Sequence, residues 1–376
     1  MNKPAGDVEQ SALTVRTDSL SVHVEEQPPE ARGGALSGGI RRLIIPVLVI
    51  ALIVCALMAL SIGAFGVSPP EIWQSLVDGV TGQQQAGVAG SVIWDIRVPR
   101  VLLAILVGGS LATAGCLMQG TFANPLAEPG IVGVSSGAAV AAVISIIAGL
   151  TAFGVWVLPA AAFVGGIAVT AGVYWLSRVD GRTEVLTLVL VGIAVNAFAG
   201  ALIGLLMSVS DDSQLRSITF WNLGSLSSAT WTSVLSVLPI ALIGIGLSGF
   251  LTHRLDLLSL GEYSAGHLGV DVESTRRQAI FLVAALTAAA VAVAGIITFV
   301  GLVVPHAMRL IVGPRHRLLL PTSALAGATL LVIADLVSRT VVAPREIPLG
   351  VLTALVGSPV FFWLLRREHK RRGAWA

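Results

Sequence analysis

The chain has 376 residues, of which 55% are hydrophobic and only 12% are charged, and its formal net charge is +2 at neutral pH. A soluble protein needs more charged surface than this, so the composition excludes an ordinary soluble globular fold. Apolar runs of about twenty residues recur along the chain, and each can cross a hydrocarbon core of about 30 Å. The sequence therefore predicts an all-α, polytopic membrane protein.

The first forty residues differ from the rest of the chain. Residues 1–40 are polar, with three basic and six acidic side chains, and show no apolar periodicity. They are expected to form a disordered cytoplasmic tail. They lack the basic start and short apolar core of a secretory signal, so the span after Arg41-Arg42 is expected to stay as a first membrane helix. The membrane domain is then residues 41–366, followed by a basic cytoplasmic tail, 367–376.

The apolar runs divide into about ten membrane spans. The stretches 131–177 and 278–313 are too long for one crossing each, and breaks are expected between Gly154 and Pro159 and near Gly295. The expected spans are 43–64, 97–119, 131–151, 155–177, 185–208, 232–252, 278–294, 296–313, 319–341 and 346–365.

The distribution of arginines orients these spans, because Lys and Arg are enriched in cytoplasmic loops. With an even number of spans, most basic residues fall on one side together with both termini, which predicts a multi-pass protein of the cytoplasmic membrane with both ends in the cytoplasm. The opposite side carries the exceptions Arg97, Arg100, Arg216, Arg339 and Arg345. Arg339 lies four residues after Asp335, a spacing that permits an ion pair on one helix face. Asp335 is expected to be structural, and Arg339 to face the exterior.

An outer segment between the first two long spans is expected to be helical. Ile72, Leu76 and Val80 recur at helical intervals, which predicts a short helix on the membrane surface. Trp73 and Trp94 are candidate interfacial anchors.

Within the fifth expected span, Gly192, Asn196, Gly200 and Gly204 recur every four residues and share one helix face. This stripe indicates either close helix packing or a face on which Asn196 lines a transport pathway.

Two irregular segments have candidate roles on the cytoplasmic side. Asn124–Gly130 holds two prolines and no basic residue, which indicates either a tight turn or a buried segment at a pore edge. The longest cytoplasmic loop, 253–278, holds Gly261–Gly269 and then Asp271 as a helix N-cap. Two short helices broken at Gly269 are expected there, serving either as a solvated connector or as a helix seated against a partner.

Enzyme signatures are absent from the sequence. A phosphate-binding P-loop needs a lysine, and the two lysines, Lys3 and Lys370, lie in no such loop. The GxGxxG match at Gly244–Gly249 lies inside an apolar span, where it cannot follow a strand. Neither HExxH nor CxxC occurs, and both cysteines fall in apolar spans. No catalytic, cofactor or metal site is therefore expected.

Several motifs together resemble one family. The segment from about Leu43 to Arg366 is similar to the FecCD-type permeases of ABC importers, which carry iron-siderophores, haem and vitamin B12. The motifs that carry the resemblance are Arg97-Val-Pro-Arg100, Leu106–Gly115, Met118–Gly120, Asn124–Gly130 with Gly133–Gly137, Gly261–Gly269, Gly301–His306 and Ile347–Gly350.

The resemblance implies a ten-helix bundle like that of the vitamin B12 permease, paired with a second copy, driven by two cytoplasmic ATPases and supplied by an extracytoplasmic binding protein. It implies no nucleic-acid partner. It assigns binding-protein docking to Arg97, Arg100 and Arg339, and the cytoplasmic gate or pathway to Asn124, Pro125, Leu126 and Asn196. It assigns ATPase coupling to Gly261, Glu262, Ala265, Gly266, Leu268 and Gly269.

Two segments indicate which cargo the protein carries. Asp211–Leu226 and Gly192–Gly204 look most like the haem-importing branch of the family, so the resemblance implies haem. A ferric siderophore, or cobalamin, is the alternative cargo. An ion-coupled secondary transporter is a further alternative, although it would need membrane-embedded carboxylates and Asp335 is nearly alone.

Overall fold

A computed structural model of the protein describes residues 38–63, 65–85, 87–179 and 181–373. The predicted disordered tail, residues 1–40, lies outside the described residues except for its last three, which begin the first helix. The predicted basic tail begins inside the last helix, which continues to Gly373.

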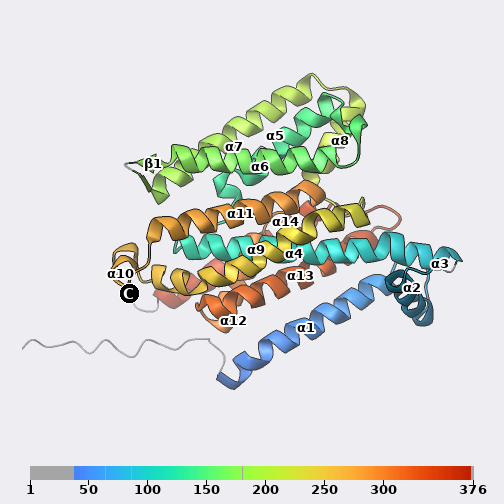
Figure 1. The fold of residues 1–376 in the computed structure, drawn as a ribbon, viewed down its shortest axis with the longest axis horizontal. Helices are drawn as coiled ribbons and strands as arrows, with labels where there is room; N and C mark the ends of the chain where they lie inside the picture. Colours follow the sequence, from blue (N-terminus) through green and yellow to red (C-terminus); the bar gives the residue numbers. More distant parts are fainter. Residues whose placement is uncertain (1–37, 64, 86, 180, 374–376) are drawn as a thin grey trace, which may run out of the picture. The chain divides into compact units, whose positions relative to one another are not determined.

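Helices account for 81% of the described chain (Figure 1). A π-helical turn, η1 (Val92–Arg97), leads directly into α4, η2 (Pro129–Val132) and η3 (Leu150–Phe153) are 3-10 turns, and the strands β1 (Arg178–Val179) and β2 (Arg182–Thr183) pair antiparallel. The helices are α1 (Gly38–Ser61), α2 (Pro69–Thr81), α3 (Gly87–Ser91), α4 (Val98–Thr121), α5 (Val134–Ile147), α6 (Val157–Leu176), α7 (Val185–Ser208), α8 (Asp212–Leu223), α9 (Trp231–Leu258), α10 (Glu262–His267), α11 (Val272–Ala294), α12 (Val300–Val312), α13 (His316–Thr340) and α14 (Leu349–Gly373).

The prediction of an all-α, polytopic membrane protein is confirmed. Among the described residues, seven helical segments are long and apolar enough to cross a membrane, and α5, α12 and α14 supply three shorter apolar helices. Ten is thus an approximate count. The expected breaks are present, because α5 ends at Ile147 before α6 begins at Val157, and α11 ends before Gly295.

The expected cytoplasmic loop, 253–278, is shorter than predicted. Helix α9 continues to Leu258, and α11 begins at Val272, where the Asp271 side chain accepts a hydrogen bond from the Ser274 amide. Of the two expected short helices only α10 is separate, since the segment after Gly269 is the start of α11. The polar residues of 253–258 and 272–278, which were predicted to lie in the loop, form the last turns of α9 and the first turns of α11.

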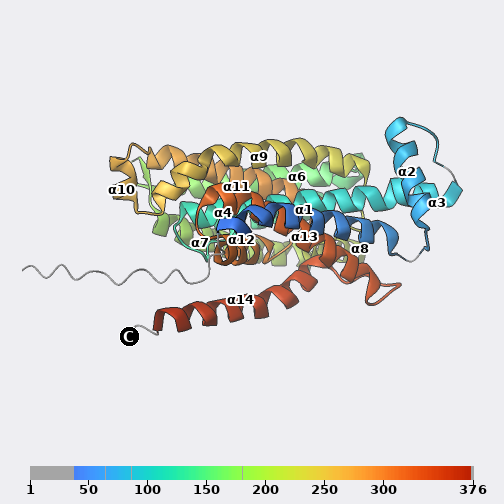
Figure 2. The same ribbon diagram turned by 90° about the horizontal axis from the view of Figure 1, so that it is seen from below.

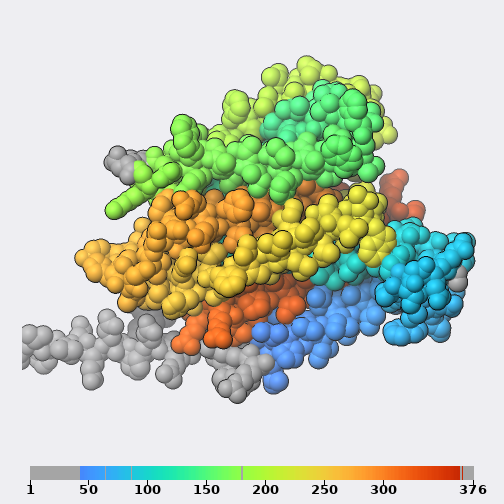
Figure 3. All heavy atoms as spheres, viewed as in Figure 1, coloured from blue at the N-terminus to red at the C-terminus, as the bar shows by residue number. Residues whose placement is uncertain are grey.

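Helix α4 lies at the centre of the packing. It contacts α9, α11, α12 and α13, and almost all of its residues are buried (Figures 1 and 2). In Figure 3 the yellow atoms of α9 and the orange atoms of α11 cover most of α4 on the face in view. Helix α1 packs mainly on α13, while α5, α6 and α7 pack on one another and reach the centre through α11.

Glycines set the distance between α4 and its neighbours. A Cβ built on Gly115 would lie 1.7 Å from the Gly301 carbonyl oxygen of α12, and one built on Gly108 would lie 2.3 Å from the Gly327 carbonyl oxygen of α13. Because lipid tails are as apolar as leucine, such close backbone contact is a main source of helix association in membranes.

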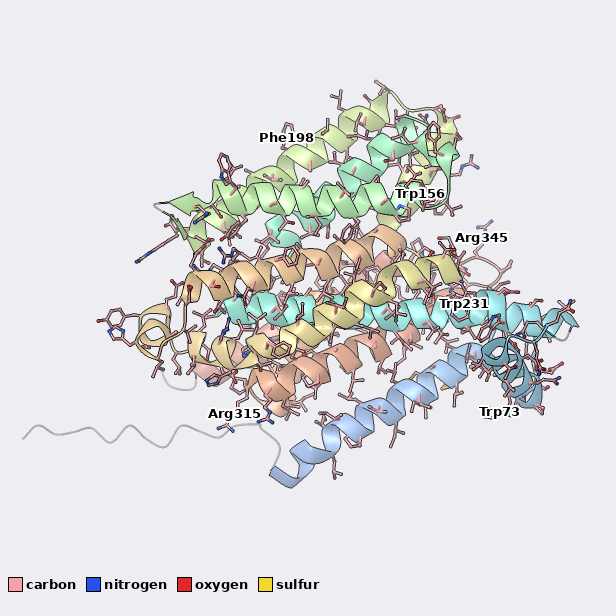
Figure 4. All side chains as sticks on the ribbon, viewed as in Figure 1. Trp73, Trp156, Phe198, Trp231, Arg315 and Arg345 are labelled. Atoms are coloured by element: carbon pink, nitrogen blue, oxygen red, sulfur yellow. The ribbon has the colours of Figure 1, made fainter. Side chains whose placement is uncertain are left out.

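Opposite ends of the bundle carry different short elements. Figure 1 shows α10 and the β1–β2 turn at one end, with α2 and α3 at the other. Figure 4 places Arg315 toward the α10 end and Trp73, Trp231 and Arg345 toward the α2 end. Helix α2 confirms that the segment around Ile72, Leu76 and Val80 is helical, and Trp73 on it is exposed; its location on the outer membrane surface stays a prediction. Trp94 packs on Trp231, with 4.8 Å between ring centroids, and an interfacial role for either Trp73 or Trp94 stays a prediction.

We expect Gly115→Ala to destabilise the protein, because the added methyl group overlaps the backbone of α12. Overpacking of this kind costs about 1–3 kcal/mol. The thermal midpoint of the detergent-solubilised protein measures the effect. Gly249→Ala is the matched control, since a Cβ on Gly249 of α9 meets nothing within 4 Å. Equal midpoints for the two variants would contradict the packing argument.

Candidate functional site

Two of the arginines at the α2 end of the bundle share a buried carboxylate. Arg100 on α4 lies 2.9 Å from Asp335 on α13, and it donates two further hydrogen bonds of 2.8 Å to Glu346 in the loop before α14. Arg339 pairs with Asp335 over 3.7 Å, which confirms the expected ion pair on one helix. The hydrogen bonds from Arg100 hold the pKa of the Glu346 carboxyl below its usual value. Asp335 is buried, in line with its expected structural role.

The C-terminal end of α1 is held by the other arginine contacts. Arg97 Nη1 donates to the carbonyls of Leu60 at 2.6 Å and Ser61 at 3.1 Å, and Nη2 donates to Phe65. Arg339 Nη2 donates to the Ala59 carbonyl. The last carbonyls of a helix have no hydrogen-bond donor within the helix, and here the guanidinium groups of Arg97 and Arg339 are the donors.

The expectation that Arg339 faces the exterior is wrong, because its side chain is only 10% exposed. Arg97 and Arg100 are buried as well. The structure therefore brings the three predicted docking residues together, with their donors directed at groups of the same chain. Binding-protein docking by these arginines stays a prediction.

The segment Asn124–Gly130 forms a compact turn after α4. Asn124 Oδ1 accepts the Leu126 amide at 2.9 Å, and the Asn124 carbonyl accepts the Ala127 amide at 3.1 Å. Ala127 is buried, whereas Asn124 and Leu126 are exposed and Pro125 is half-buried. Burial raises the pKa of the Glu128 carboxyl. The segment is therefore compact and exposes Asn124 and Leu126 while it buries Ala127. This arrangement fits an ordinary tight turn as well as a segment at a pore edge.

Asn196 joins α7 to the residues that follow this turn. Its Nδ2 donates to the Gly130 carbonyl at 3.1 Å, and its Oδ1 accepts from the Ser136 hydroxyl at 2.6 Å. One turn earlier, a Cβ on Gly192 would lie 1.9 Å from the Ile131 carbonyl oxygen. Close packing thus accounts for the first half of the stripe, whereas Gly200 and Gly204 meet nothing within 4 Å in the single chain.

The predicted coupling residues form α10 and its two flanking glycines. Gly261 has φ +103° and Gly269 has φ +84°, conformations that favour glycine, and they bound the helix. Ala265 is fully buried, whereas Tyr263 is 82% and Leu268 is 59% exposed. A Cβ on Gly266 meets nothing within 4 Å. Helix α10 therefore seats on its own chain through Ala265 and presents Tyr263, Gly266 and Leu268 outward.

A polar cluster beneath α10 was missed by sequence reasoning. Arg276 on α11 donates to Glu262 on α10 and, at 2.7 Å, to the Thr183 carbonyl of β2. Glu273 accepts hydrogen bonds from Thr183 and from Tyr174 of α6. No sequence pattern pairs Arg276 with Thr183, which lies 93 positions away.

Metal-ligating residues do not gather in the described part of the chain. No group of three or more His, Cys, Asp or Glu side chains there could hold a metal ion.

We expect Arg100→Ala to destabilise the protein strongly, because Asp335 would keep its charge in a buried site without its closest partner. Removing one partner of a buried ion pair costs about 3–5 kcal/mol. Folded yield and thermal midpoint in detergent measure the loss. Asp335→Asn in the same chain should recover part of it by removing the stranded charge. Arg345→Ala, at an exposed neighbouring position, is the control and should leave stability unchanged.

The chain is similar to several known proteins over most of its length. The hemin transport system permease protein HmuU of Yersinia pestis is 41% identical over 339 residues, which cover 88% of this chain and 97% of HmuU. The Fe(3+) dicitrate transport system permease protein FecD of Escherichia coli is 42% identical over 318 residues, covering 85% and 96%. The cobalamin import system permease protein BtuC of Halobacterium salinarum is 42% identical over 303 residues, covering 80% of each chain.

A solved structure agrees with these relatives. It is an inward-facing conformation assigned to the metal-chelate type of ABC transporter, and it matches with a TM-score of 0.78 and 35% identity over 87% of this chain and 99% of its own. The model of the FecCD transport family matches residues 51–367. The chain belongs to the FecCD transport family, and it is a permease subunit of an ABC importer whose ATP is hydrolysed by a separate ATPase subunit.

Proposed function

We propose that this permease translocates haem across the cytoplasmic membrane. The observation that carries the proposal is the match to a hemin permease over 97% of that protein's length. The sequence similarity of Asp211–Leu226 to the haem-importing branch supports it. In the structure this segment begins with α8, whose N-cap Asp211 accepts the amides of Ser213 and Gln214.

A ferric chelate is the second candidate cargo. A permease for ferric dicitrate is as similar to the chain as the hemin permease is, at 42% identity over 85% of this chain. Cobalamin is supported in the same way by a permease that is 42% identical over a somewhat shorter stretch. An ion-coupled secondary transporter is no longer a candidate, since the family consists of ABC importer permeases.

We infer that the α10 end faces the cytoplasm and that both termini lie on that side. The arginines at the ends of α6, α9 and α11 gather there, in line with the positive-inside rule. Two ATPases would bind the exposed side chains of α10, and a second permease copy would complete the pathway. A binding protein would dock at the opposite end. Docking on Arg100 would require an acidic group of that protein to replace Glu346, which is the more exposed of its two carboxylate partners.

The transport cycle we propose is alternating access. ATP-driven closure of the ATPases moves α10, the bundle tilts, and the cytoplasmic gate opens at Asn124, Pro125 and Leu126. Asn196, which is bonded to the Gly130 carbonyl, would set the position of this gate segment.

Uptake by proteoliposomes tests the cargo. The permease is reconstituted with its cognate ATPase and binding protein, and ATP-dependent uptake of haem is compared with that of ferric dicitrate and of a ferric hydroxamate. We expect haem uptake to exceed the others by more than about tenfold, a difference of about 1.4 kcal/mol in recognition. Preferred uptake of a ferric chelate would replace haem with the second candidate.

Gly266→Phe tests the coupling surface. The position is open within the chain, so the phenyl ring should leave membrane insertion intact while it obstructs contact with an ATPase. We expect uptake to be abolished at normal membrane levels of the protein. Gly246→Phe is the matched control, because Gly246 of α9 is also an open helical position. Full uptake by Gly266→Phe would rule out α10 as the ATPase contact.

A further inference from the structure

One guanidinium group joins three elements at the α10 end of the bundle. Arg276 projects from the first turns of α11, donates through Nη2 to Glu262 of α10, and donates through Nη1 to the Thr183 carbonyl at 2.7 Å. Its side chain is only 3% exposed, although Arg277, the next residue, is exposed. Its Nε has no hydrogen-bond partner among the described residues. Burial of a charged group with an unused donor is costly, so the site is not explained by stability alone.

Thr183 is the residue of the α6–α7 connection that Arg276 binds. Its amide and hydroxyl donate to Glu273 at 2.9 and 2.7 Å, and its carbonyl accepts from Arg276. Tyr174, near the end of α6, donates to the same Glu273 carboxylate at 2.8 Å. Two residues after Thr183, α7 begins. The position of this turn therefore depends on side chains of α11, one of which also holds α10.

Helix α7 connects the turn to the proposed gate. Asn196 lies thirteen residues after Thr183, about 20 Å along a helix at 1.5 Å per residue. There it bonds both the Gly130 carbonyl and the Ser136 hydroxyl, on either side of the start of α5. A hydrogen-bonded helix is stiff over such a length, so displacement at Thr183 is carried to the gate segment.

We propose that Arg276 is a positioning residue that transmits the movement of α10 to the gate, through Thr183 and α7. Among the α10 side chains of the described chain, Glu262 alone is bonded to another helix, so movement of α10 acts on Arg276 first. When Glu262 shifts, the Arg276 guanidinium moves with it. The Thr183 carbonyl then either follows the guanidinium or loses its hydrogen bond to it, and in both cases the start of α7 is displaced. This proposal deepens the proposed coupling role of α10 and rests on it.

The test compares Arg276→Met with Arg277→Met in proteoliposomes that hold the complete complex of permease, ATPase and binding protein. The cargo is whichever compound the wild-type complex takes up, so a wrong assignment of haem does not affect the outcome. For Arg276→Met we expect ATP hydrolysis to stay within about twofold of wild type while uptake falls at least about fivefold, the low end of usual coupling effects. Arg277→Met should change neither rate.

A second readout follows the gate directly. In a chain with Cys55→Ser, Leu126→Cys reports the rate of maleimide labelling in the ATP-free and the vanadate-trapped complex. We expect this rate to differ between the two states with Arg276 present and to be the same in both with Arg276→Met. Arg276→Lys should recover part of the difference, since an ammonium group can serve one of the two partners but lacks the fork that serves both.

The proposal is overturned if Arg276→Met keeps full uptake, if hydrolysis and uptake fall in parallel in an assembled complex, or if labelling at Leu126→Cys still follows the nucleotide state. Should Arg276→Met fail to assemble, Arg276→Lys decides by the same criteria with a smaller expected fall in uptake, because the ammonium group keeps the charge that pairs with Glu262 but lacks the fork that also serves Thr183. A failed coupling role for α10 would appear separately, as normal uptake by Gly266→Phe.

Discussion

Close backbone contact around α4 is the constraint on which the rest of the structure depends. Gly108 and Gly115 bring this helix against the carbonyls of Gly327 and Gly301, so α12 and α13 approach nearer than any side chain would allow. In a membrane the hydrophobic effect does little to hold helices together, and dispersion contacts between closely packed backbones take its place. The centre of the bundle is consequently rigid, and parts that move must lie outside it.

Polar contacts are concentrated at the two ends of this rigid centre. At one end, Arg97 and Arg339 satisfy the last carbonyls of α1, and Arg100 is held between two carboxylates. At the other end, Arg276 and Glu273 tie the α6–α7 turn and α10 to α11. Charged groups are costly at membrane depth unless they are paired, so their location at the ends follows from the same physics that made the middle apolar.

The arrangement suits a permease driven from one side. Helix α10 is small, bounded by two glycines of positive φ, and exposes Tyr263 and Leu268, so it can shift without disturbing α4. Helices α5, α6 and α7 reach the centre chiefly through α11, and Asn196 ties α7 to the turn after α4. A push on α10 can thus reach the turn around Asn124 through α11 and α7 while the glycine contacts stay closed.

Apolar length and charge bias in the sequence determined a polytopic helical bundle, the breaks at Gly295 and near Gly154, the N-cap at Asp271 and the helix between Gly261 and Gly269. These features are local, because span length, caps and glycine breaks depend on neighbouring residues. Motifs taken in order determined the family. The tertiary structure alone decided what the arginines contact: Arg100 meets Asp335 across 235 positions, and Arg276 meets Thr183 across 93. Sequence periodicity cannot predict such pairs. An arginine at a helix end occurs in the same local sequence pattern whether its side chain contacts solvent, a docking partner or a carbonyl of its own chain.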